Sequence, residues 1–197
     1  MIRRFVEVYF MKEYNTLDDF DVNNKTVLLR VDFNMPLDKD TLNILDTTRM
    51  KLVIPTIKEL IEKKAKIVIL AHQGRQRSWD FISMEKHAKA LQELLGKEVK
   101  FINDIFGEKV KTAIKNLALG EILFLDNVRK YSGETDKKSA EEHAQSELVQ
   151  NLYPLADLFV NDAFAAAHRA QCSLIGFTAV LPSCAGRLME KELTTLG

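Results

Sequence analysis

Short runs of apolar and β-branched residues alternate along the chain with longer segments in which apolar residues recur at helical spacing. Strands that are apolar throughout are expected in a parallel sheet whose two faces are covered by helices. The alternation therefore predicts an α/β fold, a Rossmann-like three-layer domain with a mostly parallel sheet flanked by helices. The predicted strands occupy residues 25–33, 66–72, 97–102, 121–127 and 156–162.

The segments between these strands carry helix start and stop signals. Ser83 is a predicted N-cap, and Ser139 with Glu142 forms a capping box that opens a helix closed by Pro154. Pro55 lies inside another periodic segment and indicates a kink or a late helix start there. The predicted helices occupy residues 52–64, 84–95, 105–117 and 140–153.

The composition is that of an ordinary folded protein. The chain has 197 residues, of which 46% are hydrophobic and 28% are charged, so we expect a single domain over residues 1–197. Lysine plus arginine equals aspartate plus glutamate at 28 each, so no overall field favours nucleic acid or an anionic membrane. We expect neither partner, and any preference for anions must be local.

Several common sites are absent from the sequence. Cys172 and Cys184 show no metal-ligand spacing, which argues against zinc and against a disulfide framework and suits a reducing, cytoplasmic location. No GxxxxGK[ST] or GxGxxG nucleotide motif and no GxSxG elbow occurs. The N-terminal MIRRFVEVYFM resembles a signal peptide, but Glu7 interrupts its apolar run and no cleavage pattern follows. His87 and His143 fall in predicted amphipathic helices, where surface or boundary positions are expected.

Polar and basic residues follow the predicted strands, at the edge where ligands bind in open parallel sheets. Taken singly, an arginine after a strand is usually a solvated charge, and an aspartate or asparagine there is more often a helix cap. Gathered arginines repel one another, however, and a bound anion with forked acceptor oxygens relieves the repulsion. The strand ends carry Asp32–Asn34, His72–Arg75, Asp126–Arg129, and Asn161, Asp162, His168 and Arg169.

Five sequence motifs distinguish the chain from a generic α/β domain. They occur in the order and at the spacing of the family, and together they resemble the N-terminal domain of phosphoglycerate kinase from about Thr16 to the end of the chain. Departures at Gln73 and Lys130 suggest an archaeal-like branch. The motifs are RVDFNMPL (30–37), HQGR (72–75), LDNVRKYSGE (125–134), ADLFVNDAFAAAHRA (156–170) and AGRLMEKEL (185–193).

The resemblance implies phosphoryl transfer between 1,3-bisphosphoglycerate and ADP with magnesium, a reaction of glycolysis and gluconeogenesis. It implies that Asp32 and Asn34 bind the hydroxyl and carboxylate end of the glycerate. Arg49, which follows a turn, resembles the arginine that neutralises the phosphoryl group in flight. A basic set grips the phosphate that is not transferred. The implied substrate-binding residues are Asp32, Phe33, Asn34, Arg49, His72, Gln73, Gly74, Arg75, Arg129, His168 and Arg169, with Arg49 also catalytic.

The chain is therefore expected to be the phosphoglycerate-binding half of a two-domain enzyme. Residues 185–197 resemble the start of the helix that joins the two domains, and the nucleotide-binding segments of the family have no counterpart here. The resemblance implies that a missing C-terminal domain, the partner of this one, binds Mg-ATP or Mg-ADP, and that this chain holds no metal or cofactor. Alone, the chain is expected to bind 3-phosphoglycerate or 1,3-bisphosphoglycerate without catalysing transfer. A stand-alone anion-binding or regulatory module with the same fold is the alternative.

Overall fold

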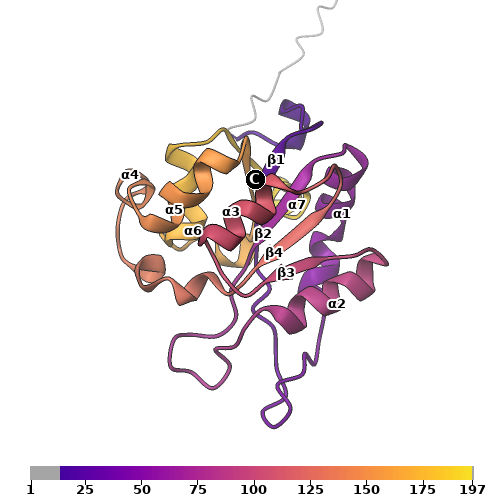
Figure 1. Cartoon of the computed structure of the whole chain (residues 1–197), viewed down its shortest axis with the longest axis vertical. Coiled ribbons are helices and arrows are strands. Elements are labelled where there is room, and N and C mark those ends of the chain that lie inside the picture. Colours follow the sequence, from indigo (N-terminus) through magenta and orange to yellow (C-terminus); the bar gives the residue numbers. More distant parts are fainter. Residues whose placement is uncertain (1–13, 197) are drawn as a thin grey trace, which may run out of the picture.

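The computed structural model describes residues 14–196, in which a parallel sheet lies between two layers of helices (Figure 1). Within these residues the sheet has six strands in the order β3-β4-β2-β1-β5-β6, and every neighbouring pair is parallel. Residues 1–13, on which the signal-peptide question bears, lie outside the described residues. The strands are β1 (Thr26–Val31), β2 (Lys66–Leu70), β3 (Lys100–Ile102), β4 (Ile122–Leu125), β5 (Leu158–Asp162) and β6 (Ser183–Ala185).

Helices cover both faces of the sheet. One apolar cluster joins a face of the sheet to α1, α2 and α7, and a second cluster joins the opposite face to α3, α5 and α6. The two clusters make the three layers of the predicted α/β fold, which is confirmed. The helices are α1 (Thr48–Glu62), α2 (Glu85–Leu95), α3 (Glu108–Lys115), α4 (Ala140–Ala144), α5 (Glu147–Leu152), α6 (Cys172–Ile175) and α7 (Arg187–Leu196).

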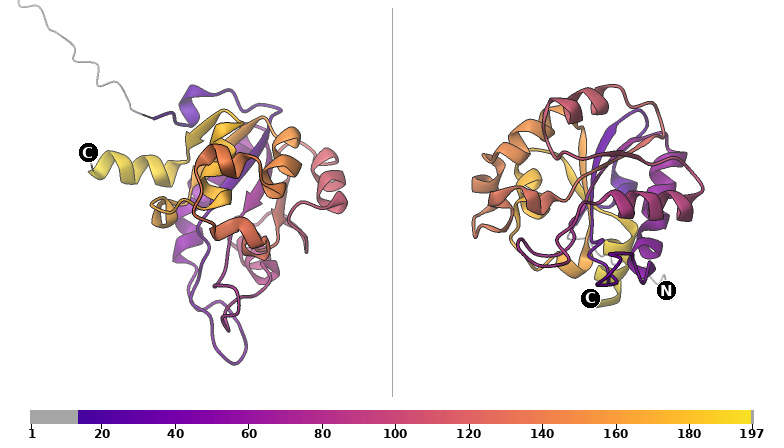
Figure 2. Two further views of the ribbon diagram at one scale, coloured as in Figure 1. Left: turned by 90° about the vertical axis from the view of Figure 1, so that its left-hand side faces the viewer. Right: turned by 60° about the horizontal axis from the view of Figure 1, so that its bottom comes forward.

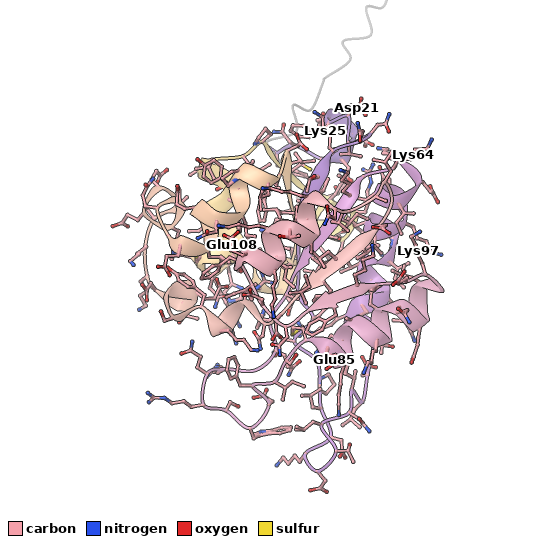
Figure 3. The ribbon with its side chains drawn as sticks, in the orientation of Figure 1. Asp21, Lys25, Lys64, Glu85, Lys97 and Glu108 are labelled. Carbon is pink, nitrogen blue, oxygen red and sulfur yellow. The ribbon has the colours of Figure 1, made fainter. Side chains whose placement is uncertain are left out.

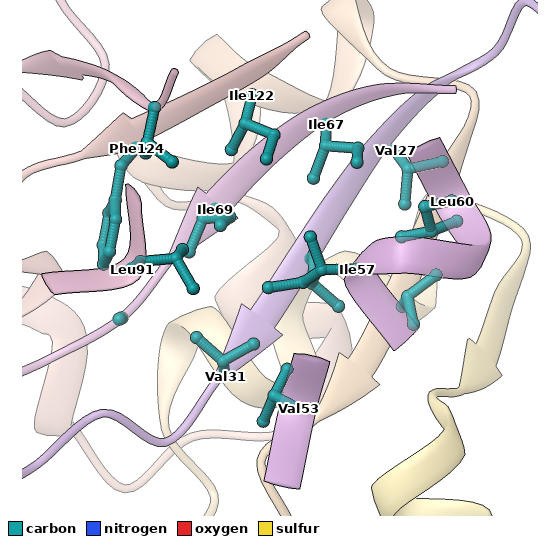
Figure 4. Close-up of a cluster of buried hydrophobic side chains, with 14 of the residues drawn as sticks. Val27, Val31, Val53, Ile57, Leu60, Ile67, Ile69, Leu91, Ile122 and Phe124 are labelled. Atoms are coloured by element: carbon teal, nitrogen blue, oxygen red, sulfur yellow. The ribbon is translucent and has the colours of Figure 1, made fainter. Parts of the chain in front are cut away.

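Strand β1 shows why the predicted strands are apolar throughout. Val27 and Val31 belong to the cluster that includes Ile57 of α1 (Figure 4), whereas Leu28 belongs to the cluster on the other face. All four side chains are fully buried. Burying one such side chain stabilises the fold by roughly 1.5–3 kcal/mol. A strand with helices on both sides gains this stabilisation on both faces, so no polar alternation appears in its sequence; Arg30 is the buried charged residue of β1.

Side chains outside the apolar runs shift several predicted boundaries. Helix α1 begins at Thr48 because the carboxylate of Asp46 accepts the Thr48 amide at 2.8 Å. The long helix predicted before β5 is divided into α4 and α5, since the Ser146 hydroxyl accepts the Val149 amide at 3.3 Å and starts a second helix. Strand β6 was not predicted, because three residues make no apolar run of strand length.

The surface or boundary positions predicted for His87 and His143 are wrong. Both residues are buried, at 0% and 1% exposure. Nε2 of His87 lies 3.1 Å from Oε1 of Gln73, and Nε2 of His143 lies 3.3 Å from the carbonyl oxygen of Ala170. Burial lowers the pKa of His87 to about 4. Helical periodicity identifies the apolar face but does not reveal acceptors behind it, and these acceptors are what allow histidine to be buried.

The loops that follow β1 and β2 extend from one end of the molecule, as Figures 1 and 2 show. They span residues 32–47 and 71–84. Charged side chains of both signs are interspersed over the remaining surface, with Lys64, Lys97 and Glu108 among those labelled in Figure 3. The uncovered carboxyl ends of the strands therefore face the two loops, and this is where a site is expected.

Helix α7 is attached to the sheet and to α1 through Asp162. This residue is fully buried at the end of β5, and its carboxylate accepts the Thr56 hydroxyl at 2.6 Å and the Met189 amide at 2.9 Å. Oγ1 of Thr56 in turn accepts the Arg187 amide at 2.9 Å. These bonds supply partners for amides in the first turn of α7, which have none within the helix. Burial raises the pKa of Asp162 to about 6.

An ion-pair cluster holds the same helix against α1. Nε and Nη2 of Arg187 donate to the two carboxylate oxygens of Glu59 at 2.6 and 2.7 Å, and Nη1 donates to Glu190 at 2.7 Å. Hydrogen bonds to Glu59 raise the pKa of Arg187 above its usual range. The fork of Arg187 therefore fixes the first turn of α7, while the far end of the helix extends beyond the rest of the ribbon in Figure 2.

We expect Phe159→Ala to lower the free energy of unfolding by about 3–5 kcal/mol, because a buried aromatic ring is replaced by a cavity. Phe159 is fully buried and stacks on Phe177 with ring centroids 5.3 Å apart. Leu119→Ala is the control, since Leu119 is 48% exposed and its truncation should cost less than about 0.5 kcal/mol. Urea denaturation measures both. Equal effects of the two substitutions would contradict this account of the core.

Asp162 should make the protein less stable as pH rises. Its pKa is about 6 in the folded protein against an ordinary value of 3.8, so the folded state binds the proton more tightly than the unfolded state. The resulting stabilisation is complete below about pH 4 and is lost as pH rises to about 6. Asp162→Asn cannot titrate, so its free energy of unfolding relative to wild type should increase by about 3 kcal/mol between about pH 4 and pH 7. Urea denaturation at both pH values tests this, and a difference that does not change with pH contradicts it.

Candidate functional site

A pocket of about 420 Å³ opens beyond the carboxyl ends of β2, β4 and β5. It joins Arg75 from the loop after β2, Arg129 from η2 (Val128–Lys130) after β4, and Arg169, which follows η5 (Phe164–Ala166) after β5. The structure thus gathers arginines that the sequence placed on a common edge. We call this site the arginine pocket; its lining is Arg75, Gln76, Arg129, Glu134, Thr135, Arg169 and Gln171.

Arg129 forms a buried wall of the arginine pocket. The residue is 6% exposed, and its Nη1 donates to the carbonyl oxygen of Gly74. Its Nε is also buried and has no hydrogen-bond partner among residues 14–196. Burial lowers the pKa of Arg129, and the charges of Arg169 and Arg75 act in the same direction. An unpaired buried donor costs about 1–3 kcal/mol, so this nitrogen is suited to an anion that enters the pocket.

Arg75 and Arg169 are exposed at the mouth of the pocket. Nε of Arg169 lies 3.4 Å from Nε2 of the neighbouring His168, which is exposed as well. His168 is not part of the lining, so its connection to the pocket runs through Arg169. Two exposed guanidinium groups beside a buried one can bind an anion with several oxygens.

Glu134 of η3 (Ser132–Thr135) lies in the same pocket and was not a predicted site residue. It is 1% exposed, and its oxygens accept the amide of Ser173 at 2.9 Å and the hydroxyl of Ser173 at 2.6 Å. Burial raises the pKa of Glu134, an effect that the nearby charge of Arg30 opposes. Oε1 of Gln171, also buried, has no partner among the described residues. One carboxylate balances at most one of the three lining arginines, so the pocket keeps an excess of positive charge that can bind an anion.

His72 lies behind the arginine pocket and is not part of its lining. It is 1% exposed, and its Nδ1 is 3.0 Å from Nη2 of Arg30, which is fully buried in β1. Burial holds the pKa of His72 far below its usual range, and the positive charges of Arg30 and Arg129 add to the effect. The imidazole is therefore neutral. Arg30 was not predicted either, although an arginine inside the apolar run TVLLRV signals a buried charge that requires partners.

The rest of the HQGR segment positions the loop. The side chain of Gln73 is buried, where Oε1 accepts the Met35 amide at 2.8 Å and Nε2 donates to the Met35 carbonyl at 3.1 Å. Gly74 has a φ of 68°, and a Cβ there would lie 2.5 Å from the carbonyl oxygen of Asp80, so only glycine fits. The Gly74 amide donates to Oδ1 of Asn34 at 2.9 Å, which links this loop to the one after β1.

The predicted site residues that follow β1 lie in different surroundings. The ring of Phe33 is buried and lies 6.0 Å from the ring of Phe124, so its side chain belongs to the core. The carboxylate of Asp32 forms an ion pair with Arg49 in the first turn of α1. A second pocket of about 230 Å³ includes this pair, so Arg49 does not share the lining of the arginine pocket. This second pocket is lined by Asp32, Arg49, Leu52, Val53, Asp162, Phe164, Ala165, Leu188 and Glu192.

Other chemistries find little support in the residues described. Over residues 14–196, no three His, Cys, Asp or Glu side chains are grouped so that they could hold a metal ion. In the same part of the chain, none of the helices has the length and apolar character needed to span a membrane. Cys172 and Cys184 are buried, and burial raises the pKa of each thiol to about 12, which disfavours a reactive thiolate.

The sequence model of the phosphoglycerate kinase family matches residues 17–197. Among curated proteins, "Phosphoglycerate kinase" of Methanobacterium bryantii is 51% identical over 183 residues, which cover 93% of this chain and 45% of that protein. "Phosphoglycerate kinase" of Archaeoglobus fulgidus is 51% identical over 181 residues, which cover 92% of this chain and 44% of that protein. The archaeal-like character suggested by the sequence is thus confirmed.

Solved structures show the same relationship. The crystal structure of phosphoglycerate kinase from Pyrococcus horikoshii OT3 is similar with a TM-score of 0.89 at 46% identity, covering 92% of this chain and 44% of that one. The structure of phosphoglycerate kinase from Coxiella burnetii has a TM-score of 0.76 at 33% identity, with coverages of 93% and 44%. The chain therefore spans less than half the length of these relatives. With the family matched over nearly all of its residues and the fold shared, the chain belongs to the phosphoglycerate kinase family.

Proposed function

We propose that the arginine pocket binds the phosphate of a phosphoglycerate, and that this chain supplies the phosphoglycerate-binding part of a phosphoglycerate kinase. The observation that carries the proposal is the buried, unpaired Nε of Arg129. A phosphate oxygen is the acceptor that this donor lacks. Gln171 supports the same conclusion, because a flip of its amide places Nε2 where the buried, unpaired Oε1 lies, and Nε2 can donate to a phosphate oxygen.

The charge of the pocket favours a phosphate over a neutral ligand. Arg75, Arg129 and Arg169 line it, and the single lining carboxylate, Glu134, is occupied by Ser173. Arginine forks match phosphate oxygens in pairs, and charge-assisted bonds of this kind are about twice as strong as neutral ones. In this arrangement Arg129 gives the fixed contact and the exposed arginines complete the binding.

The glycerate end is assigned to the loop after β1. Asn34 and Asp32 offer an amide and a carboxylate for the hydroxyl and carboxylate of the substrate, and Phe33 contributes through its place between them in the chain. Without ligand, Asp32 is paired with Arg49. Since the side chain of Arg49 is 44% exposed, its guanidinium can turn from Asp32 to a phosphoryl group, where it balances the charge of the transferring oxygens.

Phosphoryl transfer is proposed to require a second domain that binds the nucleotide. The described residues offer no cluster for magnesium, and we assign Mg-ATP or Mg-ADP to the part of the relatives that this chain does not match. When bound, the nucleotide supplies or accepts the phosphoryl group, while the residues described here bind and orient the acyl phosphate. The proposed setting is the cytoplasm, within glycolysis or gluconeogenesis.

Removing either exposed arginine should weaken the binding of 3-phosphoglycerate. Arg75→Ala and Arg169→Ala each delete a charged contact, for which we expect roughly a 10- to 150-fold increase in Kd. Arg77→Ala is the matched control, since Arg77 is an exposed arginine of the same loop as Arg75 and does not line the pocket. Calorimetric titration measures the three affinities. A common Kd for all variants and wild type would refute the assignment of the pocket.

Phosphoryl transfer should appear only when the chain is combined with the nucleotide-binding half of a related enzyme. We expect no turnover from the chain alone and measurable turnover from the mixture in a coupled assay. Arg49→Ala in the mixture should lower kcat by at least about 10²-fold, because a group that stabilises transition-state charge is lost. Its Kd for 3-phosphoglycerate, measured on the chain alone, should change much less. Intact binding without any turnover in the mixture favours the stand-alone binding module instead.

A further inference from the structure

Four buried polar side chains form a line of hydrogen bonds behind the arginine pocket. They are Glu134 of η3, Ser173 of α6, Arg30 of β1 and His72 after β2, and each is at most 1% exposed. Because they come from four different elements, their bonds connect the end of the sheet to the wall of the pocket. Polar groups buried in this way are costly unless each finds a partner.

The direction of each hydrogen bond follows from the groups involved. Ser173 donates its amide and its hydroxyl to Glu134 at 2.9 and 2.6 Å. A hydroxyl has one proton, so the serine oxygen is left to accept, and Nε of Arg30 donates to it at 2.8 Å. Arg30 also donates Nη1 to the carbonyl oxygen of Val31 and directs Nη2 at Nδ1 of His72, 3.0 Å away.

The last of these bonds determines where His72 carries its proton. A guanidinium group can only donate, so Nδ1 of His72 must accept from Arg30 and be unprotonated. In a neutral imidazole the remaining ring proton then lies on Nε2. If Nδ1 of His72 were protonated, its N–H would point at the N–H of Arg30 Nη2 in a buried site, and neither group could accept a hydrogen bond. The imidazolium form is therefore excluded by geometry as well as by charge.

The surrounding charges act in the same direction. Arginines face His72 from several packed elements, and each disfavours a further positive charge on the ring. Two carboxylates, Glu134 and Asp32, act on Arg30 and oppose the lowering of its pKa by burial. The charged groups concerned are Arg30 of β1, Arg49 of α1, Arg129 of η2, Arg169 after η5, Asp32 and Glu134.

We propose that Glu134, Ser173 and Arg30 are positioning residues that hold His72 as the neutral Nε2–H tautomer and so give the phosphate site a donor without a charge. The inference rests on the proposed function, because the phosphate is the intended acceptor. Among residues 14–196 the hydrogen bond of His72 is the one at Nδ1, and Nε2 is not among the buried atoms that lack a partner, so this N–H is left to reach a ligand from behind the pocket lining. A neutral donor adds a hydrogen bond without adding repulsion to the arginines. Its contribution stays the same between about pH 5 and pH 8, where an ordinary histidine titrates.

The resting tautomer is measured without ligand. Two-bond ¹H–¹⁵N correlation spectra of the labelled chain report the tautomer and charge of each histidine. We expect His72 to show the Nε2–H form, unchanged from about pH 5 to about pH 8. An Nδ1–H form, or a titration midpoint in this interval, would overturn the proposal.

Variants test whether the hydrogen-bonded line sets this state. Ser173→Ala removes the acceptor for Nε of Arg30, and Glu134→Gln removes the charge that orients the serine hydroxyl. We expect both to introduce tautomer exchange or a raised pKa at His72. Ser183→Ala should not, because it deletes a hydroxyl at the start of β6, at the opposite end of the parallel sheet from His72. Circular dichroism confirms that each variant folds. A folded Ser173→Ala variant with the wild-type His72 spectrum would show that these residues do not set the tautomer.

Inorganic phosphate is the ligand probe and separates this inference from the proposed function. Binding should shift the Nε2–H resonance of His72, and Ser173→Ala should weaken binding by on the order of 2- to 10-fold, with a pH dependence that wild type lacks. If phosphate shifts Arg75 and Arg169 but leaves His72 unchanged, the donor role fails and the proposed pocket stands. If phosphate does not bind, the proposed function and the donor role fail together, while the ligand-free spectra decide the tautomer by themselves.

Discussion

The arrangement of this end of the sheet depends on the burial of Arg30. Its guanidinium lies in a strand that is apolar on both faces, and water cannot reach it. Taking such a charge out of water costs several kcal/mol unless its donors are bonded. The partners are Ser173, the carbonyl of Val31 and His72, with Glu134 placed beyond Ser173. The segments that carry these partners must therefore pack at the carboxyl end of the sheet.

The charge distribution of the arginine pocket follows from this arrangement. Glu134 is bonded to Ser173 and its charge acts on both Arg30 and Arg129, but one carboxylate offsets only part of the charge of the three arginines that line the pocket. His72 is kept neutral by the guanidinium beside it. A buried negative charge, a buried positive charge and a neutral histidine thus support a pocket whose exposed groups are cationic. Rearranging any one of them would leave a buried donor or acceptor without a partner, so the network favours this one arrangement.

The sequence predicted the layers and the edge of the sheet where the site lies, because both follow from local patterns. Apolar runs such as KIVIL and helical periodicity are set by burial on two faces and on one face, respectively. The strand ends located Arg75, Arg129 and Arg169 on one rim, and the structure joins them in one pocket. These local patterns did not predict which side chains line the pocket and which are buried behind it.

Contacts between residues far apart in the chain could not be predicted from these patterns. Glu134 and Ser173 are 39 positions apart, and Arg30 and His72 are 42 apart, so no periodicity relates them. The same reason explains why Gln73 was expected to touch substrate, whereas its side chain bonds the backbone of Met35, 38 positions away. Only the charge inside the apolar strand β1 indicated that such a network must exist.

Helix α1 links the predicted catalytic arginine to the end of the described chain. Arg49 lies in its first turn, and Thr56 and Glu59 lie about two and about three turns further along, where they bond the first turn of α7. Asp162 of β5 accepts a hydrogen bond from Thr56 of α1 and another from Met189 of α7. Pro55 lies in α1 between Arg49 and Thr56 and has no amide to donate to the preceding turn, so one hydrogen bond of the helix is missing on this path. The position of Arg49 is therefore coupled to α7 through α1, and a change in the orientation of α7 must break the Asp162 and Arg187 contacts, move α1 with it or bend α1 at Pro55.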